Sequence, residues 1–374
     1  MQRNKSQNVG WITLLITGGS WCAAADATMI SVCPTCNHKT IQSAVNAAVD
    51  NDTINIAAGI YTENVTIAGK AVALNGAGGV TNGGTLVVAA GRGPVFTLGS
   101  GVTGDPNKVV VMTGMIISGG NHMGGTGVGG GIQVRAGAYL QLSGCTVTGN
   151  YATFGGGIGI NNPGAPASSI SNCVISHNLS PGTPRGVGFG GGVYVQDGSS
   201  AYLYNDTIDF NQSREGGGIY SGTGTSLVLL QTVVNGNQTI SFSTPQGPTD
   251  GDGGGISASG DFNISDSFIV NNVSSGNNGG GGLLLNVAPT GEHVITRTTI
   301  SHNGVGANDL LGGGILAGSS GGTWTLDDSF VIQNNNGGGV VYGPANTLVV
   351  TNGTVIDQNT GGNLCNVAPN GGCQ

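Results

Sequence analysis

The amino-acid sequence predicts an all-β solenoid, in which each repeat is one turn of a coil made of three short strands. Two observations carry this prediction. About eight copies of one unit recur, roughly 25 to 35 residues apart, and in each copy a short apolar segment ends in an asparagine. A glycine run closed by an aliphatic residue accompanies nearly every copy, as in "GGGI" at residues 312–315.

The composition fits a repetitive scaffold better than an ordinary globular domain. The chain has 374 residues, of which 74 are glycines and 7% are charged, and its formal net charge is -8. Collagen is excluded because the glycines cluster instead of falling at every third position, and the regular aliphatic pairs disfavour disorder. Only ten lysines and arginines are present, without a basic run, which argues against nucleic acid as a partner.

Each repeat holds three apolar positions separated by turn residues, which we interpret as three strands. A β-branched aliphatic stands three residues before each asparagine, and another aliphatic stands five residues further back, with Thr351 beside Val350 as the one slip. Such segments are too short and too rich in glycine for a sandwich or for crossover helices. Coiling would stack equivalent positions about 4.8 Å apart and join the aliphatics into ladders. The third position closes the glycine runs at Ile132, Ile158, Val193, Ile219, Ile256, Leu283, Ile315 and Val340.

The recurring asparagines are predicted to form a structural ladder at a corner of the coil. An asparagine at a tight turn can take the left-handed conformation, and its side-chain amide can bond the equivalent amide in the next coil. The glycine runs allow a sharp bend with φ above zero. The predicted ladder consists of Asn150, Asn178, Asn211, Asn237, Asn272, Asn303, Asn334 and Asn359.

The amino-terminal part is expected to hold a leader and a cap. Residues 1–27 have the layout of a secretory signal, with a short apolar run followed by small residues, and a disordered cytosolic leader is the rival interpretation. Residues 28–52 are expected to cap the coil, because residues 40–49 place Ile41, Ala44, Val45 and Ala48 on one helical face.

The coil itself is expected to cover residues 53–360, with a carboxyl-terminal cap at residues 361–374. Before the regular repeats, strand-like runs lie at residues 54–56, 65–67, 72–74, 86–88, 95–98 and 109–112.

The segment "KTIQSAVNAAVDNDTINIAAGIYTENVTIAGKAVALNGAGG", residues 39–79, resembles the amino-terminal part of right-handed parallel β-helix proteins of the pectin-lyase-like superfamily. The "GGGI", "FIVNN" and "TISHN" units resemble the repeats of polymorphic outer membrane proteins. The resemblance implies a right-handed parallel β-helix over nearly the whole mature chain. It says little about activity, since this fold hosts lyases, hydrolases, esterases, adhesins and phage spikes.

The motifs that the resemblance implies for glycan-cleaving members are missing. The sequence contains no Gly-His-Gly with Arg-Ile-Lys, no Gln-Asp-Thr-Leu and no Arg-x-Pro-x-x-Arg. Asp206 and Asp209 are three apart on an expected strand and should point to opposite faces, so they suit one catalytic site poorly. His177 and His302 occupy a position that also accepts glycine, phenylalanine and glutamine, which indicates a tolerant surface position.

The cysteines suggest structural bonds near both ends. Cys33 and Cys36 form a "CPTC" ahead of the expected helix, where a redox motif is conceivable, but a secreted chain without a βαβ pattern favours a structural disulfide. Cys365 and Cys373 are expected to staple the carboxyl end. Cys145 and Cys173 share one register in adjacent coils. A disulfide between them and two buried free thiols are equal alternatives.

Charge gathers at one place in the coil. Glu215 and Asp252 each precede a glycine triplet in neighbouring copies, so their carboxylates should stack near 5 Å apart. Arg214, Arg185 and Asp250 lie close by in the alignment. This cluster is either an oxygen-rich calcium site or a solvated group of salt bridges worth little energy.

The sequence therefore predicts a secreted or cell-surface scaffold that is adhesive or binds polysaccharide and does not cleave it. The alternative is a carbohydrate-active enzyme, a polysaccharide lyase or a glycoside hydrolase, with an atypical site. An extracellular polysaccharide or a cell-surface molecule is the expected partner. No cofactor is implied apart from calcium, and neither a nucleic-acid partner nor a membrane span is expected. The protein is expected to be a monomer.

Overall fold

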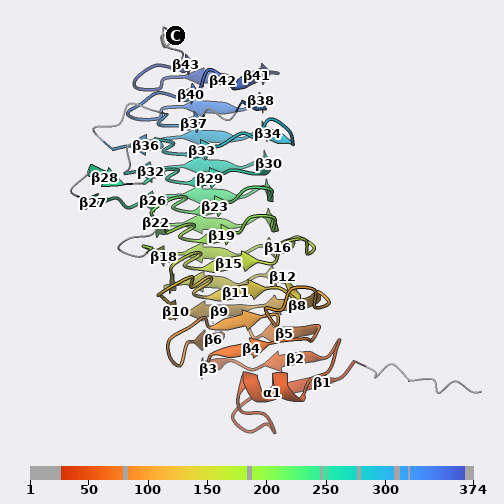
Figure 1. Ribbon diagram of the computed structural model, residues 1–374. Helices are drawn as coiled ribbons and strands as arrows, with labels where there is room; N and C mark the ends of the chain where they lie inside the picture. The colour runs from red at the N-terminus through yellow and green to blue at the C-terminus, as the bar shows by residue number, and fades with distance from the viewer. Residues whose placement is uncertain are drawn as a thin grey trace, which may run out of the picture.

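The computed structural model describes residues 27–78, 83–182, 188–244, 247–249, 251–275, 279–306, 312–318 and 321–366. The chain forms a right-handed parallel β-helix, drawn in Figure 1 as a column with the short helix α1 (Ile41–Ala47) at one end and β43 near the other. The predicted fold class is confirmed.

Three long parallel sheets, here called A, B and C, form the walls of the column. Sheet A stacks β1 (Met29–Val32), β2 (Thr53–Ile56), β5 (Val72–Gly76), β8 (Lys108–Thr113), β12 (Ala138–Ser143), β16 (Ser168–Ser171), β20 (Ser200–Tyr204), β24 (Ser226–Leu230), β30 (Asp261–Ser265), β34 (His293–Thr296), β38 (Thr323–Asp327) and β41 (Thr347–Thr351). Sheet B stacks β3 (Gly59–Thr62), β6 (Thr85–Val88), β9 (Met115–Ser118), β13 (Thr146–Thr148), β17 (Val174–Ser176), β21 (Thr207–Asp209), β25 (Val233–Asn235), β31 (Phe268–Val270), β35 (Thr299–Ser301), β39 (Phe330–Ile332) and β42 (Val355–Asp357). Sheet C stacks β4 (Val65–Ile67), β7 (Phe96–Leu98), β11 (Ile132–Arg135), β15 (Ile158–Asn161), β19 (Val193–Val195), β23 (Ile219–Ser221), β29 (Ile256–Ala258), β33 (Leu283–Leu285), β37 (Ile315–Ala317), β40 (Val340–Tyr342) and β43 (Leu364–Asn366).

The middle coils contain a fourth strand that the sequence pattern did not predict. In these coils the chain turns after its sheet B strand, and the next two residues run extended and pair in a short sheet D before the chain turns again. Sheet D stacks β10 (Asn121–His122), β14 (Tyr151–Ala152), β18 (Leu179–Ser180), β22 (Gln212–Ser213), β26 (Gln238–Thr239), β32 (Val273–Ser274) and β36 (Gly304–Val305). An antiparallel hairpin, β27 (Phe242–Thr244) with β28 (Gly247–Thr249), follows β26. A two-residue strand is too short to show an alternating pattern, which is why sequence periodicity misses it.

The predicted aliphatic ladders fill the interior. In sheet B, Ile208 pairs with Ile175 on one side and with Val234 on the other, and all three are fully buried. In sheet A, Leu326 pairs with Val350 and not with Thr351, so the slip in the last copy is a one-residue shift of the pattern. Burial of these aliphatics in successive coils gives a core that runs along most of the column. In the last coil the ladder ends, with Val350 44% exposed and Ile356 partly buried.

The asparagine ladder is continuous from Asn150 to Asn359. Each Nδ2 atom donates to the Oδ1 atom of the next asparagine, as from Asn178 to Asn211 at 3.0 Å, and also to a backbone carbonyl of the preceding coil, as from Asn178 to Val147 at 2.9 Å. The backbone N–H of Asn178 donates to the same Oδ1 atom of Asn211 at 3.0 Å. All of the amide groups are therefore satisfied inside the coil, where a polar group without a partner is costly.

The predicted left-handed conformation of these asparagines is wrong. The residue directly before each one adopts it instead, with φ between 51° and 65°. The bend must come one residue earlier because the asparagine side chain has to point into the coil to reach its neighbours. This position is glycine in two copies, such as Gly149, and in the others it is an exposed or half-exposed larger residue such as Phe210 or His302.

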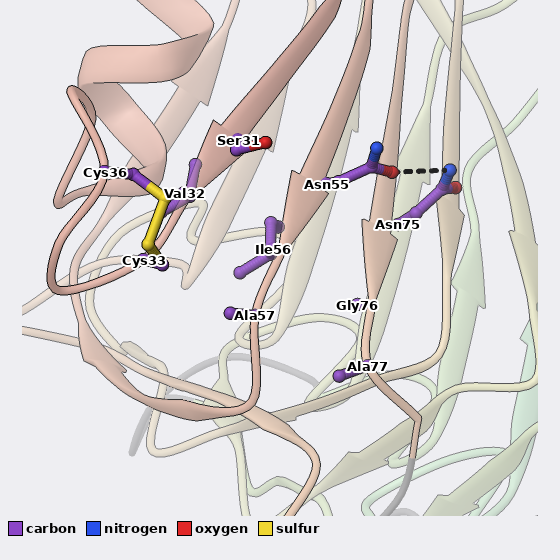
Figure 2. Close-up of a pocket in the computed structure, with 10 residues that line it drawn as sticks. All are labelled: Ser31, Val32, Cys33, Cys36, Asn55, Ile56, Ala57, Asn75, Gly76 and Ala77. Atoms are coloured by element: carbon purple, nitrogen blue, oxygen red, sulfur yellow. Dashed lines mark hydrogen bonds between the residues drawn. A yellow bond between two sulfur atoms is a disulfide. The ribbon is translucent and has the colours of Figure 1, made fainter.

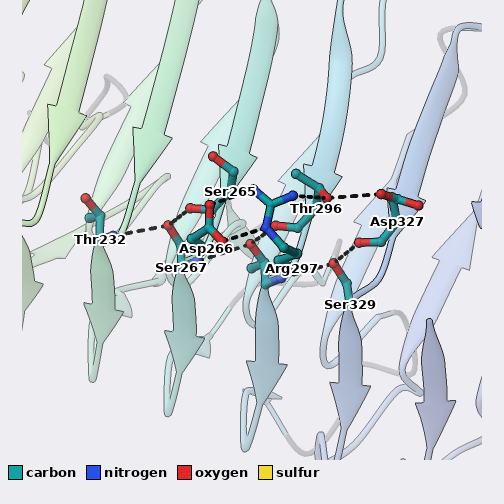
Figure 3. Close-up of polar contacts among 9 residues, drawn as sticks. Thr232, Ser265, Asp266, Ser267, Thr296, Arg297, Asp327 and Ser329 are labelled. Carbon is teal, nitrogen blue, oxygen red and sulfur yellow. Dashed lines mark hydrogen bonds and ion pairs between the residues drawn. The ribbon is translucent and has the colours of Figure 1, made fainter. Parts of the chain in front are cut away.

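A second polar ladder lines the corner between sheets A and B. The backbone N–H of each member donates to the side chain of the next, as from Thr232 to Ser267 Oγ at 3.1 Å and from Thr298 to Ser329 Oγ at 3.1 Å. Figure 3 shows this corner, with Arg297 joined outside it to both carboxylate oxygens of Asp266 at 2.7 Å. The ladder runs through Cys145, Cys173, Asp206, Thr232, Ser267, Thr298, Ser329 and Thr354.

The glycine triplets make the other sharp corner, where the chain enters sheet C. The first glycine of a triplet is left-handed, with φ of 62° at Gly216. The second lies against the backbone of the next coil, since a Cβ on Gly217 would sit 2.3 Å from the carbonyl oxygen of Gly254. Only glycine fits both requirements.

Helix α1 covers the amino-terminal end of the coil and is shorter than the predicted residues 40–49. Thr40 caps it by accepting a hydrogen bond from the backbone N–H of Ser43, and the Glu63 carboxylate accepts from the first two helical N–H groups at 2.8 and 2.9 Å. Ile41 and Val45 lie buried against the first coil. The predicted leader, apart from Ala27, and the last eight residues of the predicted carboxyl-terminal cap lie outside the described residues, and those domain boundaries remain predictions.

Candidate functional site

The predicted charge cluster lies at the corner between sheets D and C, on the outside of the coil. The residues that directly precede the glycine triplets stack there as paired positions in adjacent coils, in the order Val128, Phe154, Phe189, Glu215 and Asp252. Glu215 and Asp252 are thus direct neighbours, with the N–H of Gly216 donating to the carbonyl oxygen of Asp252 at 3.0 Å.

Two serine hydroxyls bind Glu215 at this corner. Ser257 Oγ donates to Glu215 Oε1 at 2.8 Å, and Ser213 Oγ donates to the carbonyl oxygen of Glu215 at 2.7 Å. Asp252 and Arg214 are buried, and Glu215 is partly exposed. The other two residues predicted for this cluster, Arg185 and Asp250, lie outside the described residues.

Four aromatic side chains, here called the aromatic column, adjoin Glu215 on the same outer surface. Phe189 stacks on Tyr220 with ring centroids 4.2 Å apart and an interplanar angle of 16°. Tyr194 stacks on Tyr220 at 5.6 Å, and Phe154 lies 5.4 Å from Tyr194. All four rings are partly exposed, so the column is a continuous aromatic strip across three coils that ends at the carboxylate.

The aromatic column was missed by sequence reasoning, although the repeat alignment contains its signal. Phe154 and Phe189 share the position of Glu215 before a glycine triplet, while Tyr194 and Tyr220 share the second position of the following strand. In the following coils the same strand position is occupied by Ser257 and then by a buried apolar group made of Leu284, Leu316, Val341 and Cys365.

The tyrosines of the column are neutral hydrogen-bonding groups. Burial, with a smaller effect of the nearby Asp197 carboxylate, raises the pKa of Tyr194 to about 12. Burial also raises the pKa of Tyr220, and Glu215, Tyr194 and Asp197 add to the shift. Both phenols therefore keep their protons at any physiological pH and remain able to donate a hydrogen bond to a ligand.

Asp206 and Asp209 lie on opposite sides of the wall. Asp206 is 1% exposed, inside the second polar ladder, where its carboxylate accepts from the N–H groups of Cys173 at 2.7 Å and Tyr204 at 3.0 Å. Burial raises the pKa of Asp206 to about 7. Asp209 lies on the outer face of sheet B, where burial also raises its pKa and the nearby His177 opposes that rise. The two carboxyl groups do not form one site.

His177 and His302 do more than occupy a tolerant surface position. Both are left-handed, with φ of 55° and 57°, and they form the bend before a ladder asparagine. The position tolerates many side chains because these point to solvent, but it fixes the backbone conformation. His177 also packs on Phe210 of the next coil, with ring centroids 5.4 Å apart.

The cysteines fall into a bonded and an unbonded class. Cys33 and Cys36 form a disulfide, whereas Cys145 and Cys173 are buried free thiols, which settles the alternative left open by the sequence. Cys365 is also in a disulfide, and its expected partner Cys373 lies outside the described residues. Across the described ranges, no three His, Cys, Asp or Glu side chains gather closely enough to hold a metal ion. No helix in that part of the chain is long and apolar enough to span a membrane.

Comparison with known proteins yields likenesses among solved structures only. No protein-family model and no curated protein matches the chain. It is similar to pectin methylesterase from Aspergillus niger, with 13% identity, a TM-score of 0.35, and coverage of 89% of this chain and 86% of that chain. It is also similar to alginate lyase from Paenibacillus sp. str. FPU-7, with 14% identity, a TM-score of 0.36, and coverage of 87% of this chain and 99% of that chain. For pectate lyase Pel9A the identity is 18%, the TM-score 0.32, and the coverage 89% and 80%. Likenesses this distant carry no argument about what this chain binds or cleaves.

Proposed function

We propose that this protein is a secreted or cell-surface scaffold that binds a polysaccharide along the corner between sheets D and C without cleaving it. The observation that carries the proposal is the aromatic column, which ends at the Glu215 carboxylate on the outside of the coil. The resemblance of the repeats to polymorphic outer membrane proteins adds the expectation of an adhesive role.

A stacked aromatic strip suits a polymer that is rich in hydroxyl groups. Equivalent rings in adjacent coils, Phe154 with Phe189 and Tyr194 with Tyr220, lie 5.6 Å apart, so a chain parallel to the column axis meets the same kind of contact in each of these coils. Tyrosine offers a rigid apolar body with a polar tip, at little cost in conformational entropy. A carboxylate at the end of the strip accepts hydrogen bonds from hydroxyl groups.

The charges of this corner favour a neutral polysaccharide. Glu215, Asp252 and Asp197 are acidic, and the described basic residue beside them, Arg214, is 5% exposed. An acidic polymer would meet like charge here and would need a bridging cation. Calcium bound between Glu215 and Asp252 is therefore the second form of the proposal, in which the glycan would be acidic.

The neighbouring carboxylates are also the observation that favours a carbohydrate-active enzyme as the alternative. Acid and base catalysis of glycan cleavage uses two carboxyl groups that face one substrate. Glu215 and Asp252 are paired positions in adjacent coils, with Glu215 partly exposed and Asp252 buried beside it.

A glycan array on the purified mature protein, read together with reducing-end release from the same glycans, tests the proposal against this alternative. Binding of neutral glycans without release supports the scaffold, whereas release that Glu215→Gln abolishes would establish the enzyme. Calorimetry with calcium on the wild type and on the Glu215→Gln/Asp252→Asn double variant tests the calcium form. If the wild type takes up no calcium, that form is wrong.

A further inference from the structure

The Cys33–Cys36 disulfide borders an open pocket at the amino-terminal end of the column. Figure 2 shows the bridge beside Val32, with Asn55 and Asn75 across the pocket. The cavity has a volume of about 440 Å³ and follows the ends of β1, β2 and β5. Its lining includes the small residues Ala57, Gly76 and Ala77, and Asn75 Nδ2 donates to Asn55 Oδ1 at 3.3 Å.

This disulfide contributes little to the stability of the fold. It joins residues only three apart in the sequence, and a disulfide that closes such a short loop restricts the unfolded chain least. Backbone hydrogen bonds already fix the loop, since the N–H of Cys36 donates to the carbonyl oxygen of Cys33 at 3.1 Å and the N–H of Cys33 donates to that of His38 at 3.2 Å. Both cysteines are partly exposed, in contrast to the buried Cys145 and Cys173.

We propose that Cys33 and Cys36 form a thiol–disulfide exchange site whose substrate is a thiol that enters this pocket. The thiol is either that of a small molecule or that of a cysteine in an extended peptide, because the pocket is open and several of the side chains that line it are small. Thiol–disulfide exchange requires that a thiolate reach the disulfide, which a structural disulfide buried in the core would prevent.

The reaction consists of two balanced exchanges. The incoming thiolate attacks Cys36 Sγ, the bond between the two protein sulfurs breaks, and Cys33 leaves as a thiolate while a mixed disulfide forms on Cys36. A second thiolate then attacks the substrate sulfur of that mixed disulfide. Cys36 leaves as the second thiolate, two substrate thiols are thereby oxidised to a disulfide, and the protein pair becomes two thiols once Cys33 and Cys36 have each taken up a proton.

Thr35 assigns the leaving sulfur to Cys33. Its Oγ1 atom lies 3.4 Å from Cys33 Sγ, and a sulfur in a disulfide has no proton, so the hydroxyl is the donor. The same hydroxyl would stabilise the thiolate that forms when the bond breaks, and a better-stabilised leaving thiolate speeds exchange. Thr35 is therefore a positioning residue for this reaction.

Equilibration of the wild-type protein in glutathione redox buffers, followed by alkylation and mass mapping, tests the site with the Cys365 disulfide as internal reference. We expect half-reduction of the Cys33–Cys36 pair at a ratio of reduced to oxidised glutathione at least tenfold lower than for Cys365. Thr35→Val should slow reduction several-fold, while the exposed Thr66→Val on β4 should leave the rate unchanged. In Cys33→Ser, glutathione should remain as a mixed disulfide on Cys36.

A variant with a larger side chain in the pocket distinguishes a small-molecule thiol from a peptide cysteine as the substrate. Ala77→Trp, which narrows the pocket, should slow exchange with glutathione and with a cysteine-containing peptide equally if the substrate is a small thiol, and should slow the peptide more if the substrate is a peptide segment. The proposal is overturned if the Cys33–Cys36 pair resists reduction as strongly as the Cys365 disulfide does, or if the rate is the same in Thr35→Val as in the wild type.

Discussion

Asn211 and Asn237 are joined in adjacent coils by two hydrogen bonds to one atom. Both the side-chain Nδ2 atom and the backbone N–H of Asn211 donate to Oδ1 of Asn237 at 3.0 Å, and the same Nδ2 atom donates to the carbonyl oxygen of Ile175 at 2.8 Å. Each asparagine thus ties its own coil to the coils on both sides. At this corner the backbone N–H of Asn211 bonds a side chain, whereas its carbonyl oxygen accepts from the backbone N–H of Gln238 at 3.0 Å.

Replacement of Asn211 by alanine should destabilise the protein by about 2–4 kcal/mol, because buried partners in both neighbouring coils lose their hydrogen bonds. Chemical denaturation followed by circular dichroism measures the change. Gln212→Ala, at the next and exposed position of the same corner, is the matched control and should stay close to the wild type. Equal stabilities of the two variants would contradict the role of the ladder.

Replacement of Ile300 by aspartate should also cost several kcal/mol, because Ile300 is fully buried between Ile269 and Val331 of the adjacent coils. Thr299→Asp, one residue earlier and on the outer face of β35, should be tolerated. Thermal unfolding of both variants checks the register of sheet B. An unchanged melting temperature for Ile300→Asp would show that this register is wrong.

Asp206 should make the protein less stable as the pH rises. Its folded-state pKa of about 7 lies above the ordinary value of 3.8, so the folded state binds the proton more tightly than the unfolded chain does. The stabilising contribution is complete below pH 3.8 and is lost as the pH rises to about 7, a change of roughly 4 kcal/mol. In Asp206→Thr, which copies Thr232 of the next coil, this dependence should vanish, and denaturation curves between pH 4 and pH 8 measure it. A parallel slope in the variant would rule out Asp206 as its source.

Export predicts a defined covalent state. Cleavage near Ala27 should remove the leader together with Cys22, and alkylation of the denatured protein without reductant should label two cysteines, Cys145 and Cys173. Intact-mass measurement before and after reduction reads both features. Recovery of Met1, with every thiol open to alkylation before reduction, would instead place the protein in the cytoplasm.

The sequence was sufficient for the coil because its core repeats. One aliphatic per strand at a constant distance from an asparagine determines which residue points inward, and the register of Ile175, Ile208 and Val234 follows directly. The left-handed residue was assigned one position too late, since the pattern marks a corner without showing which residue bends. The two-residue strands of sheet D were missed because they are too short for a period.

The candidate site was harder to predict because it depends on the outward positions, which vary from copy to copy. Glu215 and Asp252 stood out as charges before glycine triplets, but Phe154 and Phe189 at the same position did not, although together they make one surface. The second polar ladder was also missed, since cysteine, aspartate, threonine and serine share no obvious pattern. What its members share is a side-chain atom that can accept a hydrogen bond from the backbone of the preceding coil.

The most direct test of the proposed function is calorimetric titration of a neutral glycan identified on the array into three proteins. These are the wild type, the Tyr194→Ala/Tyr220→Ala double variant, and Tyr202→Ala, which removes a partly exposed tyrosine from the outer face of sheet A. We predict at least tenfold weaker binding by the double variant and unchanged binding by Tyr202→Ala, because only the former removes rings of the aromatic column. Equal affinity of the double variant and the wild type would contradict the assignment of polysaccharide binding to this corner.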